Sequence, residues 1–300
     1  MRAKLYTGST MGRSRAESEK LSSEDEALLE AELRAQLGIY FRHVVGLAGV
    51  YEHIGDDGTQ RPQIPFYFSA VILEIDNCWY LATAGHIVEK LNAAATRKDM
   101  RLVAVDIEDS FAPKARYNHP IKYFAYQDAN KFCRHEEGGL DCGLIELRQN
   151  YRDLLTANGV QPLVERHWNP SQVARCNTFL MLGFPQDSVV ASITDGRKQY
   201  LAAVRATPSV VWVERSKTRR KGTRSAACTR FVGKVGDEKQ VGNIVGMSGG
   251  PIFCFRGTNF ENYFVAGIQS SWDPESRLTF ACAIPDVLTA ARDFLANQEH

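Results

Sequence analysis

The chain has 300 residues, of which 44% are hydrophobic and 24% are charged, and its formal net charge is +1. This length suffices for one large domain or two packed halves, and the composition is that of an ordinary globular protein. The balanced charge gives no whole-chain argument for a nucleic-acid or anionic-membrane partner. No apolar run approaches the ~20 residues of a membrane span, so we expect no membrane partner.

Two further features bear on the compartment. Basic residues near the N-terminus are not followed by an apolar run, so we expect no secretory signal. The seven cysteines are odd in number and contain no Cys-x-x-Cys pair. This pattern is typical of reduced thiols, and we therefore expect a cytoplasmic protein.

Residues 1–38 are expected to form a polar extension that carries one amphipathic helix. Residues 23–26 fit a capping box, and leucines recur behind it at helical spacing over about 24–37. Gly38 is the expected stop of this helix. The sequence does not indicate what the helix does.

From residue 39 the chain changes to short apolar runs separated by turn-forming clusters. Many short strands with few helices favour an all-β barrel or sandwich. A closing helix is expected at about 285–297. The runs expected to form strands are Val44–Tyr51, Phe66–Ile75, Trp79–Ala82, Arg101–Asp106, Gly143–Leu147, Thr178–Leu182, Leu201–Val204, Val210–Val213, Phe264–Ser270 and Leu278–Ala283.

The segment 246–251, Gly-Met-Ser-Gly-Gly-Pro, suits a tight loop better than a helix or a strand. Such a loop can direct several backbone N–H groups at one point, as an oxyanion hole requires. Ser248 is then a candidate nucleophile, and the N–H groups of Gly246 and Ser248 are candidate oxyanion donors. The alternative is an ordinary glycine turn.

His86 and Asp141 are the candidate base and orienting acid. His86 follows an apolar run and has small residues before it, and Asp141 directly precedes an apolar run. An aspartate so placed can hold an imidazole by its N–H. Taken alone, His86 would be explained by packing at a strand end and Asp141 by capping of a turn.

Together, the segments 83–86, 141–145 and 246–251 resemble the trypsin-like (chymotrypsin-fold) serine peptidases, which share the order His, Asp, Ser. The resemblance covers roughly residues 39–297. It implies two six-stranded antiparallel β-barrels, with His86 and Asp141 in the first, at 39–168, and Ser248 in the second, at 169–300. The segment 182–185 is similar to the family's Gly-aromatic-Pro element early in the second barrel.

The activity implied by the resemblance is that of a serine endopeptidase. It would hydrolyse a protein or peptide substrate through an acyl-enzyme intermediate, with no metal and no organic cofactor. Met247 stands where zymogen-activated members carry an aspartate, which argues against activation by N-terminal cleavage. Ile87 stands where those members carry a cysteine. The resemblance is therefore to the disulfide-free, bacterial or HtrA-like branch, although no PDZ-like region fits after residue 285.

The resemblance also implies a set of substrate-binding residues. Gly242, six residues before Ser248, corresponds to the pocket base and carries no charge. The strand around Gly267 would pair with the substrate backbone. A small or medium neutral side chain is the expected preference. The other residues assigned to this strand and to the pocket wall are Gln269, Ser270 and Ser271.

Two clusters have competing explanations. The segment 215–224 carries six positive charges, which suit an acidic or nucleic-acid partner, but a solvated hairpin loop is the commoner explanation. It contains no aromatic residues for base stacking, so nucleic-acid binding is disfavoured. Cys133, His135 and Cys142 lack the spacing of a structural zinc site.

Two functions compete with the active enzyme. The chain could be a catalytically silent trypsin-like domain that binds other proteins, or a latent protease activated by a regulatory partner. Loss of a triad member would favour the silent domain, and no member is missing.

Overall fold

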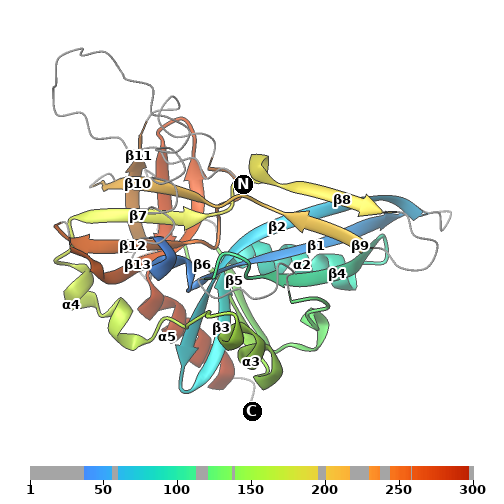
Figure 1. Cartoon of the computed structure of the whole chain (residues 1–300), viewed down its shortest axis with the longest axis horizontal. Coiled ribbons are helices and arrows are strands. Elements are labelled where there is room, and N and C mark those ends of the chain that lie inside the picture. The colour runs from blue at the N-terminus through green and yellow to red at the C-terminus, as the bar shows by residue number, and fades with distance from the viewer. Residues whose placement is uncertain are drawn as a thin grey trace, which may run out of the picture.

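The computed structural model describes residues 37–55, 60–112, 121–136, 139–194, 201–216, 230–236, 244–257 and 259–296. Within these residues the chain forms two six-stranded antiparallel sheets that lie side by side, with short helices at their margins (Figure 1). Besides a helical segment at residues 37–41, the helices are α2 (Gly85–Thr96), α3 (Gln149–Ala157), α4 (Pro170–Val173) and α5 (Ile284–Ala296). Single 3₁₀ turns are η1 (Tyr126–Asp128), η2 (Glu165–Trp168) and η3 (Gln186–Ser188).

The first sheet is built mainly from consecutive antiparallel neighbours. Its order is β4-β1-β2-β3-β6-β5. Buried residues follow one another along β1, β3 and β6 and do not alternate with exposed ones. Such runs are typical of strands that are covered on both faces of the sheet. The strands are β1 (Val44–Ile54), β2 (Gln60–Ile75), β3 (Cys78–Thr83), β4 (Met100–Glu108), β5 (Lys131–His135) and β6 (Asp141–Leu147).

The second sheet is a closed barrel in the order β10-β11-β14-β13-β12-β7. A separate hairpin of β8 (Val190–Thr194) and β9 (Leu201–Arg205) leaves this barrel and lies along β1 and β2 of the first sheet (Figure 1). The barrel strands are β7 (Thr178–Gly183), β10 (Ser209–Arg215), β11 (Arg230–Val235), β12 (Pro251–Arg256), β13 (Asn259–Asp273) and β14 (Leu278–Cys282).

The expected all-β fold class is confirmed: the described residues form two six-stranded antiparallel sheets and a C-terminal helix. One detail differs. Among the described residues the first sheet is open between β4 and β5, whereas a second closed barrel was expected. Helix α2 contacts both edge strands and buries Ile87, Val88 and Leu91. Its apolar face therefore covers the opening.

The predicted N-terminal helix at 24–37 lies outside the described residues except for Leu37. The predicted stop at Gly38 is wrong, because residues 37–41 are helical. Tyr40 explains the extension: its ring packs 5.2 Å from the ring centroids of Phe253 and Tyr263, and it is 3% exposed. Burying this aromatic ring offsets the ~1 kcal/mol that a glycine costs inside a helix. The domain limits at 38 and 168 remain predictions.

Behind Tyr40, a buried polar cluster joins β1 to the second barrel. His43 contacts the carbonyl oxygen of Gln161 through Nδ1 and the hydroxyl of Tyr263 through Nε2, each at 2.6 Å. The ring of His167 stacks on Tyr263 at 5.5 Å. Burial lowers the pKa of His43 to about 3 and that of His167 to about 4. Both imidazoles are therefore neutral in the folded protein near neutral pH.

This cluster predicts acid sensitivity. The unfolded chain regains ordinary histidine pKa values near 6.5, so below that pH it binds more protons than the folded protein at these two sites. The free energy of unfolding should fall as the pH falls from about 6.5 to 4, by about 1.4 kcal/mol per pH unit for each histidine. Asp109 has the opposite effect. Burial raises its pKa to about 6, so below that pH the folded protein binds a proton there more readily than the unfolded chain does. Over part of this range its gain in the free energy of unfolding offsets the loss from one histidine.

A His167→Phe variant isolates one histidine, since it keeps a ring against Tyr263 and removes one titrating group. The free energy of unfolding, measured with urea across this pH range, should change less steeply with pH than in the wild type, by about 1.4 kcal/mol per pH unit. A variant with the wild-type slope would show that His167 is not responsible.

Candidate active site

His86 and Asp141 meet at the end of the first sheet. Asp141 begins β6, and His86 lies in the first turn of α2, directly after β3. One carboxylate oxygen of Asp141 accepts from the backbone N–H of His86 and the other contacts its Nδ1, both at 2.9 Å. Helix α2 has no side-chain cap of its own, so Asp141 also caps its N-terminus. Both backbone and ring of His86 are thereby fixed. Because a carboxylate oxygen accepts, this contact requires the ring proton on Nδ1.

Asp141 is also tied to the second barrel. Its backbone N–H donates to Sγ of Cys282 in β14 at 3.3 Å, and that thiol contacts the Asp141 carbonyl oxygen at 3.5 Å. The Asp141 side chain is 6% exposed, whereas the His86 side chain is 36% exposed. The acid is therefore shielded from solvent while the imidazole remains accessible.

The loop that carries Ser248 packs against the strand that leads to His86. Thr83, at the end of β3, donates its hydroxyl to the Ser69 carbonyl oxygen at 2.8 Å. A side chain on Gly249, where φ is +90°, would overlap both that oxygen and Thr83 Oγ1. The glycine therefore permits the serine loop to lie directly against β2 and β3. This contact brings Ser248 to the same end of the sheet as His86.

The loop also presents backbone N–H groups. Within the described part of the chain, neither the Gly246 nor the Ser248 N–H has a hydrogen-bond acceptor. Gly249 N–H donates to the Gln269 carbonyl oxygen at 2.8 Å, which anchors the loop to β13. Ser248 is partly exposed, and among the described residues no hydrogen bond joins its hydroxyl to His86.

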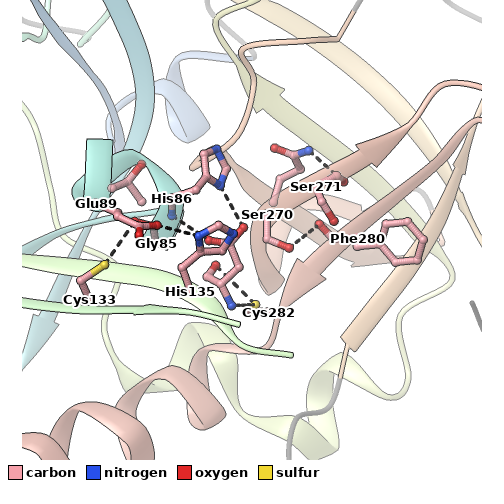
Figure 2. Close-up of polar contacts among 12 residues, drawn as sticks. Gly85, His86, Glu89, Cys133, His135, Ser270, Ser271, Phe280 and Cys282 are labelled. Carbon is pink, nitrogen blue, oxygen red and sulfur yellow. Dashed lines mark hydrogen bonds and ion pairs between the residues drawn. The ribbon is translucent and has the colours of Figure 1, made fainter. Parts of the chain in front are cut away.

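The structure describes four of the five predicted substrate-binding residues, and two of these have buried side chains. Gly242 lies outside the described residues. Gly267 lies in β13 against the Cys282 carbonyl group. Ser270 is 1% exposed and donates its hydroxyl to the Phe280 carbonyl oxygen at 3.3 Å (Figure 2). Gln269 is also 1% exposed and donates its side-chain amide to the Ser271 carbonyl oxygen at 3.1 Å, so both side chains are buried and bonded to main-chain carbonyl groups.

A second imidazole beside His86 was not anticipated as part of the site. The rings of His86 and His135 lie 5.8 Å apart and are seen side by side in Figure 2. His135 contacts Glu89 of α2 at 2.7 Å through Nδ1. Cys133 donates its thiol to the Gly85 carbonyl oxygen at 3.2 Å, and burial raises its pKa to about 11. Pairing of β5 with β6 brings His135 opposite Asp141, and the sequence alone did not identify β5.

Within the described residues, no group of three or more histidine, cysteine or acidic side chains is arranged to hold a metal ion. No helix in that part of the chain is long and apolar enough to cross a membrane. None of the six cysteines described is in a disulfide, and Cys228 lies outside the described residues.

Comparison with known proteins gave no matching family model and no matching curated protein. Among solved structures, the chain is similar to a catalytically inactive tobacco etch virus protease complexed with substrate, with 11% identity over 88% of this chain and 86% of that chain and a TM-score of 0.38. It is similar to a Glu endopeptidase, with 11% identity over 83% and 90% and a TM-score of 0.41. The VesB protease of Vibrio cholerae shows 14% identity over 88% and 65%, with a TM-score of 0.40. Similarity of this size transfers no residue role.

The close contact at Gly249 predicts a large effect of a single methyl group. Gly249→Ala should lower the free energy of unfolding by about 2–5 kcal/mol, because it adds left-handed strain and overlap with Ser69 and Thr83. Gly257→Ala is the matched control, since that glycine has φ of +59° with no atom near the added Cβ. It should cost about 1–2 kcal/mol. Equal losses in urea unfolding would contradict the contact.

Proposed function

We propose that the chain is a serine endopeptidase whose triad is His86, Asp141 and Ser248. The observation that carries the proposal is the double hydrogen bond from His86 to the Asp141 carboxylate. This contact commits Nδ1 to the acid and leaves Nε2 as the nitrogen available to a nucleophile. The packing of Gly249 against Thr83 supports Ser248 as that nucleophile.

In the proposed reaction, His86 Nε2 takes the proton of the Ser248 hydroxyl as its oxygen attacks the substrate carbonyl carbon. Asp141 holds the ring tautomer and stabilises the imidazolium, and it stays ionised. The N–H groups of Gly246 and Ser248 stabilise the oxyanion. His86 then gives its proton to the leaving amine, and water hydrolyses the acyl-enzyme.

A serine nucleophile is favoured over a cysteine nucleophile. Cys133 is close to His86, but its thiol is bonded to the Gly85 carbonyl group and its pKa is raised to about 11. Burial also raises the pKa of the Cys142 thiol. A cysteine nucleophile requires a thiolate, which both environments disfavour.

The second candidate is a silent or partner-activated domain that binds proteins. One observation favours it: among the described residues, the Ser248 hydroxyl makes no hydrogen bond to His86. Catalytic hydrogen bonds are often long without substrate, so the same observation is compatible with an active enzyme. The labelling experiment below separates these candidates. For the peptidase we further propose a preference for a small or medium neutral side chain and a cytoplasmic location. For the partner-activated domain we propose a regulatory protein partner.

Reaction with a fluorophosphonate probe tests the nucleophile. The full-length protein should be labelled at Ser248, and Ser248→Ala should remove both the label and peptide hydrolysis, because the nucleophilic oxygen is lost. Peptide mapping of the labelled protein identifies the modified residue. An unlabelled wild type, or a label that survives Ser248→Ala, would overturn the proposal.

Replacement of the acid tests the orienting role. Asp141→Asn should lower kcat by about 10⁴-fold, because an amide cannot hold the same His86 tautomer. Asp128→Asn, at the exposed turn η1, is the control and should retain wild-type kcat. A kcat for Asp141→Asn within tenfold of wild type would show that Asp141 does not orient the base.

A further inference from the structure

The peptide group between Val245 and Gly246 is held by a residue outside the serine loop. The backbone N–H of Gln186 donates to the Val245 carbonyl oxygen at 2.7 Å. Gln186 begins the turn η3, just after the Phe184-Pro185 pair that follows β7. This is a strong main-chain hydrogen bond by its length.

This bond fixes the direction of a proposed oxyanion donor. In a trans peptide the carbonyl and the N–H point in opposite directions. Because the Val245 carbonyl turns toward Gln186, the Gly246 N–H turns away from it. That N–H has no acceptor among the described residues, as a donor reserved for substrate requires.

The backbone of Gly246 itself also lies close to Gln186. Gly246 has φ of +94°, and a Cβ placed on it would lie 2.6 Å from the Gln186 nitrogen. On the other side of Gly246, the Ser69 hydroxyl makes a longer contact of 3.5 Å to its carbonyl oxygen. The same hydroxyl accepts from Phe184 N–H at 2.8 Å. Both peptide groups that flank Gly246 are thus contacted from outside the loop.

We infer that the Gln186 backbone N–H is a positioning group that keeps the Gly246 N–H aimed at the substrate carbonyl. This inference rests on the proposed peptidase function. Without the bond, the 245–246 peptide is able to rotate and to turn the Val245 carbonyl toward the developing negative charge. Met247 is buried in the barrel core and carries no charge, so its side chain cannot form a salt bridge that would hold the loop instead.

The test compares two substitutions at one position. Gln186→Ala keeps the N–H, whereas Gln186→Pro replaces it with a ring carbon that displaces the Val245 carbonyl. The backbone accepts proline here, because η3 begins at this residue and the preceding Pro185 has an extended ψ of 143°. For each full-length variant we would measure kcat, KM and the inhibition constant of a peptide aldehyde, whose adduct resembles the tetrahedral intermediate.

Gln186→Ala should stay within about threefold of wild type in all three constants. Gln186→Pro should lose about 10²-fold in kcat, the effect of removing one oxyanion donor, with KM little changed. Its affinity for the aldehyde should fall by a similar factor, because only the tetrahedral adduct carries the oxyanion. A proline variant that matches the alanine variant, or one that changes KM alone, would overturn the inference.

A second variant keeps the test possible if Gln186→Pro does not fold. Substituting the α-hydroxy acid analogue of glutamine at position 186 turns the amide into an ester, which removes the N–H without adding a ring. The same loss of kcat and of aldehyde affinity is expected, and wild-type constants would overturn the inference. A wild type without Ser248-dependent hydrolysis would instead overturn the proposed function, and this inference with it.

Discussion

The proposed site depends on one steric constraint, the contact of Gly249 with the Ser69 carbonyl and Thr83. No other residue type fits at 249, because a Cβ would overlap both groups. Since Thr83 ends the strand that leads to His86, the contact sets where the serine loop lies relative to the base. Asp141 makes the complementary link, because it holds His86 and contacts Cys282 of the second barrel. Two contacts between the sheets thus define the geometry.

The serine loop is held without a charged anchor. Met247 is fully buried among apolar residues of the barrel, so burial of its side chain stabilises the loop where a salt bridge would otherwise be needed. Gln186 and Ser69 add polar contacts on either side of Gly246. That N-terminal cleavage is not required stays a prediction.

Most of the strands could be predicted from the sequence because each is marked by a local pattern of residues. The ten expected strands lie within observed strands to within a residue, since each was an apolar run between turn residues. The expected runs do not include β5, β8, β11 and β12. For β5 the reason is that Lys131–His135 ends in charged and polar residues, and its strand state comes from pairing with β6. A short helix beginning at about 87–91 was expected, and α2 is longer than that stretch because its apolar face covers β4 and β5. Gln186, Ser69 and His135 were missed for the same reason: their roles arise from contacts between segments that are distant in sequence.

In the proposed mechanism Ser248 is the nucleophile, and the Gly246 and Ser248 N–H groups receive the oxyanion. A crystal structure of the full-length protein with a peptide boronate tests this mechanism most directly. We expect a boron atom bonded to Ser248 Oγ, with one boron-bound oxygen within hydrogen-bond distance of both N–H groups. A boronate bound elsewhere, or a Val245 carbonyl turned into that position, would contradict this mechanism.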